Sequence, residues 1–284
     1  MAGPVTDEWS WDPSLFEGSA PFYRRGRLAY PDGLADALAE LAGLDGTGVL
    51  ADVGCGPGLV TVVLAPRFER VLAIDPDAAM LDEARAHARE LQVHNVEWLQ
   101  ARIEEVDLPS ASLRMVTFGR SFHWVDQPSV AAAMRQALVP GGWLVLVSDV
   151  KGDDPKIRSD LPPPPEDEVT ALVRRYLGDR RRAGRGALGS GPPHTEEEAL
   201  AAAGFAGPVR LRVPRSSLAM TREIDDVLAW VYSRSSSAPH LFGDRLPDFE
   251  ADLQALLRAR SPSGRFMRPT PDAEARAWSN PGPG

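Results

Sequence analysis

The chain has 284 residues, of which 43% are hydrophobic and 25% charged, and this balance excludes a wholly disordered chain. Its 31 basic and 40 acidic residues give a net charge of −9, which argues against binding a nucleic-acid backbone over a large area. The single cysteine excludes an internal disulfide and a thiolate metal cage. No stretch approaches the roughly 18 apolar residues of a membrane span, and the acidic start lacks a secretory pattern, so we expect a cytosolic protein without metal.

The first half of the chain alternates short apolar runs with segments of helical periodicity. We expect helices at about 32–43, up to about 64, 78–91 and 129–138, and strands at 49–53, 71–74, 96–99, 113–118 and 143–147. Pro140, Gly141 and Gly142 predict a turn before the last of these strands. Strands that read as continuous apolar runs and alternate with helices predict a parallel sheet covered on both faces.

The pattern becomes irregular after about residue 150. Four consecutive prolines predict a stiff loop at 151–165, and residues 179–193 are rich in Arg and Gly. We expect helices at 166–176, 196–203, 221–231 and 247–260, a strand at 209–213, and a frayed last dozen residues. These segments are expected to add the last strands of the same sheet and a cap over it.

A glycine-rich turn, Gly54 to Gly58, lies between a buried strand and a helix, where the carboxyl edge of a parallel sheet meets a helix N-terminus. The dinucleotide fingerprint needs a glycine where Leu59 stands, so the spacing is a different one. Asp75 ends the next strand, 21 residues after Gly54, where a carboxylate accepts hydrogen bonds from ribose hydroxyls. The alternative is a tight turn with a capping acid and no ligand.

Taken together, these motifs resemble those of the class I S-adenosylmethionine-dependent methyltransferases. Residues 49–58 resemble the first motif of that family, 71–81 its second-strand motif, and 138–144 the turn into its fifth strand. Residues 22–31 and 121–124 are similar to elements of its small-molecule, type 11 branch. The resemblance implies an α/β fold with a Rossmann-like, seven-stranded, mostly parallel sheet. It implies an N-terminal helical cap at 1–45, an S-adenosylmethionine-binding core at 46–150, and acceptor-binding elements with the end of the sheet at 151–284.

The resemblance also implies a set of cofactor-binding residues. Arg102 stands where many relatives carry an Asp that accepts from the adenine amino group, so either the backbone or Glu104 is expected to take that role. The methionine and ribose would contact Asp52, Gly54, Gly56 and Gly58, and the ribose hydroxyls would bind to Asp75. The adenine would contact Pro76, Met80, Ile103 and Glu104. The methionine end would lie near Gly119 and Arg120, and Tyr23 and Arg27 would reach its carboxylate or close over the cofactor.

His123 is the best-placed candidate for a catalytic base, because an imidazole removes protons near neutral pH. A structural role, hydrogen-bonded to backbone, is the alternative. We expect a methyltransferase that acts on an O or N of a small molecule, as in natural-product tailoring, and that is a monomer or a homodimer. The alternatives are a nicotinamide oxidoreductase, which the glycine spacing disfavours, and a non-catalytic S-adenosylmethionine-binding regulator or partner subunit.

Overall fold

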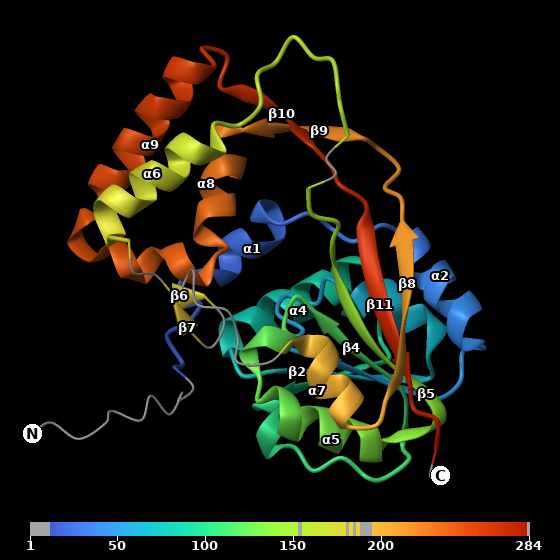
Figure 1. Ribbon diagram of the computed structural model, residues 1–284. Helices are drawn as coiled ribbons and strands as arrows, with labels where there is room; N and C mark the ends of the chain where they lie inside the picture. Colours follow the sequence, from blue (N-terminus) through green and yellow to red (C-terminus); the bar gives the residue numbers. More distant parts are fainter. Residues whose placement is uncertain (1–11, 153–154, 180–181, 184–185, 188–194, 283–284) are drawn as a thin grey trace, which may run out of the picture.

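The computed structural model describes residues 12–152, 155–179, 182–183, 186–187 and 195–282 (Figure 1). A seven-stranded sheet is its centre, in the order β3-β2-β1-β4-β5-β11-β8. The strands are β1 (Val49–Val53), β2 (Arg70–Asp75), β3 (Val96–Gln100), β4 (Leu113–Gly119), β5 (Leu138–Asp149), β8 (Ala206–Val213) and β11 (Ala273–Ser279). The first five run parallel, and β11 is antiparallel to both β5 and β8. The predicted Rossmann-like, mostly parallel sheet is confirmed.

Helices cover both faces of this sheet. On one face lie α2 (Gly33–Ala42), α3 (Thr61–Leu64) and α4 (Ala78–Glu90), and on the other lie α5 (Gln127–Ala137) and α7 (Glu196–Ala202). Leu34 and Leu38 of α2 are fully buried against the sheet. The helix α2 therefore belongs to the sheet layers, although residues 1–45 were expected to form a cap.

The cap is a separate layer of helices above the carboxyl edge of the sheet (Figure 1). It contains the helices α1 (Ala20–Gly26), α6 (Glu166–Leu177), α8 (Ile224–Tyr232) and α9 (Leu246–Arg260). It also contains an antiparallel pair of strands, β9 (Ala219–Glu223) and β10 (Arg265–Pro269). Its own aromatic core includes Tyr232, Phe242 and Phe249, and α1 joins it by packing on α8. Across the described ranges, no helix combines the length and the apolar character needed to cross a bilayer.

Several predicted boundaries differ from the structure. The segment 221–231 was expected to be one helix, but its first residues form β9 because they pair with β10. The turn predicted at 140–142 lies inside β5, where Gly141 has φ +79° and the pairing with β4 is irregular. Much of 179–193 lies outside the described residues, and the short strands β6 (Arg182–Ala183) and β7 (Gly186–Ala187) fall within it.

The largest correction concerns the end of the chain, which was expected to be frayed. Residues 273–279 form β11 in the interior of the sheet, with Ala273, Ala275 and Ala277 fully buried and Trp278 only 1% exposed. The sequence did not indicate a strand here, because its buried face is made of alanines, which have a low β-propensity. The alternation of buried and exposed residues that is typical of a strand was therefore hard to recognise.

We expect Trp278→Ala to lower the free energy of unfolding by about 3–5 kcal/mol, because it opens a cavity the size of an indole in a fully buried site. Urea denaturation followed by circular dichroism measures this change. The exposed Leu218 supplies the control, since Leu218→Ala is expected to change stability by less than about 0.5 kcal/mol. Equal effects of the two substitutions would contradict the central place of β11.

Candidate functional site

The glycine-rich turn is folded so that bare backbone faces a pocket at the carboxyl edge of the sheet. The amides of Gly54 and Cys55 both donate to the carbonyl of Ile74, at 2.8 and 3.1 Å, which ties the turn to the end of β2. Gly56 has φ +52°, and a Cβ added there would meet no atom within 4 Å. The open space in front of Gly56 is therefore available to a ligand, at a position that only glycine adopts without strain.

Gly54, Gly58 and Gly119 are needed for packing, each for its own reason. A Cβ on Gly54 would lie 2.5 Å from that of Ser121, and a Cβ on Gly119 would lie 2.7 Å from Val60. Gly54 and Gly119 also line the pocket. Gly58 lies outside the pocket lining, where its Cβ would lie 3.3 Å from Ala84 and from Trp98.

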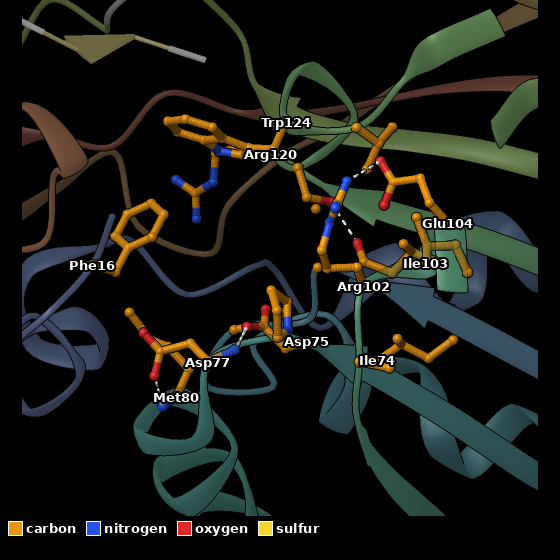
Figure 2. A pocket seen from close by; sticks show the side chains of 18 of the residues that line it. Phe16, Ile74, Asp75, Asp77, Met80, Arg102, Ile103, Glu104, Arg120 and Trp124 are labelled. Carbon is orange, nitrogen blue, oxygen red and sulfur yellow. Dashed lines mark hydrogen bonds and ion pairs between the residues drawn. The ribbon is translucent and has the colours of Figure 1, made fainter. Parts of the chain in front are cut away.

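Asp75 is the buried acid of the pocket. Its Oδ2 accepts from the Gly56 amide at 2.8 Å and its Oδ1 from the Asp77 amide at 2.9 Å, so the backbone fixes the carboxylate in place (Figure 2). Burial raises the pKa of Asp75 to about 6, against the lowering effect of these two amides. Each oxygen retains a further lone pair, so the carboxylate can accept two more hydrogen bonds from a ligand.

Asp52 lies deeper, at the foot of the turn. It is fully buried, and its two oxygens accept from the hydroxyls of Thr61 at 2.5 Å and Thr117 at 2.8 Å. Burial raises the pKa of Asp52 to about 6. Asp52 lines a small cavity beside the turn, together with Tyr30 and Arg120, but it lies outside the lining of the first pocket. Asp52 therefore joins β1, β4 and α3 beneath the site, although it was expected to contact the methionine and ribose.

The rest of the pocket lining is mostly apolar and contains one ion pair. Pro76, Met80 and Ile103 are among its apolar residues, and Met80 and Ile103 are seen in Figure 2. Arg102, which stands in place of the expected acid, lies 3.5 Å from the carboxylate of Glu104. The same Glu104 carboxylate accepts from the Asp126 amide at 3.1 Å, so it is held at the rim as a hydrogen-bond acceptor.

Two aromatic residues of the site had no assigned ligand role in the sequence analysis. Phe16 lies before the first helix in a segment with no periodicity, so no local pattern indicated its role. Its ring packs edge-on against Trp124 at 5.7 Å and against Tyr23 at 6.2 Å between ring centroids. Phe16 and Trp124 both line the pocket and lie next to one another (Figure 2).

A second, larger cavity opens beyond these aromatic rings, between the sheet and the cap. It encloses about 1950 Å³ including its open mouth, against about 760 Å³ for the first pocket. The two spaces share five lining residues, namely Phe16, Tyr23, Arg120, Ser121 and Trp124. A molecule in the larger cavity would therefore meet a ligand of the first pocket at this junction.

Arg120 occupies the junction in a rare backbone conformation. Its φ is +60°, which costs a non-glycine residue on the order of 1–3 kcal/mol and is typical of functional sites. The side chain is held by Asp149, whose Oδ2 lies 3.0 Å from Nη1, and by the Tyr30 ring at 5.1 Å. Arg27, by contrast, lines the larger cavity and not the first pocket.

His123 lies in the short helix η3 (Phe122–Trp124) that follows β4, and it lines the larger cavity beside the junction. His123 is exposed to the open cavity, and partial desolvation by the cavity walls lowers the pKa of its ring below the usual 6.5. Glu196 opposes this effect, whereas Lys151 and Arg27 add to it. The imidazole is consequently neutral at pH 7 and has a lone pair available for a proton.

The first pocket fits S-adenosylmethionine by its own chemistry. An adenosine needs an apolar slot and an acid for the ribose hydroxyls, which the wall at Met80 and Ile103 and the fixed carboxylate of Asp75 supply. The bare backbone at Gly56 leaves room for the methionine part of the cofactor, which is attached to the ribose. No group of three or more potential ligands that could hold a metal occurs among the residues whose positions are given.

Comparisons with known proteins agree with this geometry. Residues 50–142 match the family model of a methyltransferase domain. An uncharacterised methyltransferase of Mycobacterium tuberculosis is 34% identical over 131 residues, which are 46% of this chain and 61% of that protein. The chain thus spans about three fifths of that relative's length.

Two further comparisons are a sequence match over a shorter segment and a structural superposition over most of the chain. The ubiquinone biosynthesis O-methyltransferase of Acinetobacter baylyi is 39% identical over 102 residues, 35% of this chain and 42% of that protein. The structure of a candidate type II methyltransferase from Anaeromyxobacter dehalogenans superposes with a TM-score of 0.52 at 24% identity, covering 89% of this chain and 98% of that one, which supports the fold. The matched residues, the sheet order and the pocket together show that residues 50–142 form a methyltransferase domain within a fold of the class I S-adenosylmethionine-dependent type.

Proposed function

We propose that this protein transfers the methyl group of S-adenosylmethionine to an O or N atom of a small molecule that binds in the larger cavity. The observation that carries the proposal is the junction of the two cavities, where five residues line both spaces and His123 lies just beyond. A nucleophile that enters from the cap side has to approach the cofactor pocket through this junction.

Positioning and exclusion of water account for most of the catalysis in this proposal. When bound, S-adenosylmethionine supplies a methyl group that is already attached to a good leaving group. The rings of Phe16, Tyr23 and Trp124 enclose the junction, and Arg120 is fixed there by Asp149. Alignment of two reactants in such a site contributes roughly 7–11 kcal/mol.

His123 has the position and the protonation state of a general base. The lowered pKa leaves its ring neutral at pH 7, so it can accept the proton that an O–H or N–H acceptor loses. Asp75 holds the cofactor ribose in the same proposal, and the turn at Gly54 and Gly56, with Asp52 beneath it, supports the methionine part. Glu104 accepts from the adenine amino group in place of the acid missing at Arg102.

The size and the walls of the larger cavity favour a small-molecule acceptor. The cap closes over the sheet edge, and the cavity is lined by side chains from α1, β5, η3 and α8. A relative over the core is by name an O-methyltransferase, which agrees with an oxygen acceptor. A natural-product acceptor is one such small molecule.

A non-catalytic S-adenosylmethionine-binding protein is the alternative, and turnover separates the two. Release of S-adenosylhomocysteine is measured with the purified chain and a panel of phenols, amines and hydroxy acids. Calorimetry with S-adenosylhomocysteine runs in parallel. Binding together with turnover supports the proposal, binding without turnover on the whole panel favours the regulator, and no binding contradicts both.

We expect Asp75→Ala to weaken S-adenosylhomocysteine binding by about 1–3 kcal/mol, because the ribose hydroxyls and the amides of Gly56 and Asp77 lose their acceptor. The affinity of the wild type should also fall as the pH drops through about 6, since the raised pKa of Asp75 makes protonation remove the ribose acceptor there. Calorimetry at pH 5, 6 and 7.5 measures both effects.

The matched control is Asp82→Ala, which removes an acid with a 78% exposed side chain on α4. This variant should bind like the wild type. If Asp75→Ala binds within twofold of the wild type, another acid holds the ribose.

A further inference from the structure

The larger cavity is positively charged in a protein of net charge −9. Six Arg and Lys side chains line it against two acidic ones. Three of the six form ion pairs, Arg120 with Asp149 at 3.0 Å, Arg276 with Glu196, and Arg268 with Glu166 at 3.6 Å. Clefts with an excess of one sign concentrate ligands of the opposite sign, so this cavity favours anions.

Arg27 is a cation of this wall for which the described residues provide no ion pair. In the described part of the chain, its guanidinium makes one hydrogen bond, from Nη2 to the carbonyl of Ser233 at 2.8 Å. Its Nε is buried and has no partner there, and no carboxylate of the described residues forms an ion pair with it. Its neighbour Arg24 shows the usual arrangement, because it pairs with Glu90 at 2.5 Å.

The surroundings of Arg27 make this lack of a partner costly. Burial lowers its pKa and Arg120 adds repulsion, whereas Tyr23, with its ring 5.2 Å from the guanidinium carbon, and more weakly Tyr30 and Asp149 work against that effect. A buried cation is stable when an anion meets it, and an unpaired one is expensive. An anionic ligand in the cavity would supply the missing partner.

The same space contains the proposed base. Arg27 and Lys151 both lower the pKa of His123, so both cations lie within electrostatic range of its ring. Glu196, on α7, lines the same cavity and has the opposite effect on the pKa of the ring. A ligand whose hydroxyl or amine faces His123 would therefore have cationic groups close by.

We propose that the methyl acceptor is an anion, a small molecule with a carboxylate or phosphate group, and that Arg27 binds this group while the reacting O or N faces His123. The proposal rests on the proposed function and makes it narrower. It assigns Arg27 to the acceptor, whereas the sequence resemblance assigned it to the cofactor.

The test compares matched probes that differ in charge. Ligand-observed NMR measures binding of 4-hydroxybenzoate, phenyl phosphate and the neutral 4-hydroxybenzamide to the protein saturated with S-adenosylhomocysteine. We expect at least one anionic probe to bind about tenfold or more tightly than the amide, the scale of one hydrogen bond to a charged group. Which anion binds more tightly distinguishes carboxylate from phosphate.

Variants then test the residue. Arg27→Gln should remove the preference for the anion, Arg27→Lys should retain part of it, and Arg24→Gln, on the helix that ends just before Arg27, should leave it unchanged. Thermal melts establish whether each variant folds. If Arg27→Gln does not fold, the anion preference of Arg27→Lys is compared with that of the wild type instead. A wild type without anion preference, or a preference that survives in folded Arg27→Gln and Arg27→Lys alike at full strength, overturns the proposal.

Cofactor binding separates this proposal from the one on which it rests. Calorimetry with S-adenosylhomocysteine is run on the wild type and on Arg27→Gln. A wild type that fails to bind contradicts the proposed function itself. If Arg27→Gln loses about tenfold in S-adenosylhomocysteine affinity while the anion preference remains, Arg27 serves the cofactor and only the present inference is overturned.

Discussion

Replacing His123 with alanine is expected to lower the rate of methylation by about 10²–10⁴, because the acceptor's proton then has no base to receive it. The affinity for S-adenosylhomocysteine should change little, since His123 lines the acceptor cavity and not the cofactor pocket. His123→Asn should not restore the rate, because an amide cannot take the proton at neutral pH. Single-turnover kinetics and calorimetry measure the two quantities separately.

The pH profile gives a second reading of the same residue. The wild-type rate should fall toward low pH with a midpoint below 6.5, because the pKa of His123 is lowered and the protonated ring is inactive as a base. The control is His94→Ala, an exposed histidine between α4 and β3, which should keep both the rate and the midpoint. If His123→Ala keeps most of its turnover but melts at a lower temperature, the histidine is structural and positioning alone carries catalysis.

Gly56→Val should weaken S-adenosylhomocysteine binding by about 100-fold or more, ~2.7 kcal/mol, while the fold survives. The new side chain would fill the open space in front of the turn, where no protein atom lies within 4 Å, and so would take the place of the ligand. It would also strain a backbone with φ +52°, at a cost on the order of 1–3 kcal/mol in stability. Calorimetry measures the loss of binding and urea denaturation the cost in stability.

Gly43 supplies a matched control for this substitution. It ends α2 with φ +57°, also with no atom within 4 Å of an added Cβ, but it lies outside the pocket. Gly43→Val should therefore lose a similar amount of stability and bind S-adenosylhomocysteine normally. Normal binding by Gly56→Val would show that the ligand does not occupy the space in front of the turn.

The residues of the cofactor pocket were accessible to sequence reasoning where they lie in short, contiguous motifs. The turn at Gly54 and Gly56 and the acid Asp75 are each fixed by local geometry, namely a strand end, a positive φ and two backbone amides. The sequence motifs did not predict that Phe16 lines the pocket or that Arg27 lies outside it. Both depend on where the N-terminal segment crosses the sheet edge, which contacts distant in sequence decide.

The sequence by itself determined the parallel sheet from β1 to β5 and the place of the ligand turn, because apolar runs, glycines and the acid occur in order along one segment. Only the tertiary structure decided that β11 lies inside the sheet, since its buried alanines become a strand when β5 and β8 pair with them on both sides. The tertiary structure also forms the proposed acceptor cavity. Packing of α1 on α8 brings Arg27 and Arg234, which is 207 residues later in the chain, into the wall of the same cavity. Local sequence encodes local geometry, whereas a cavity between layers depends on the packing of segments that are far apart in the chain.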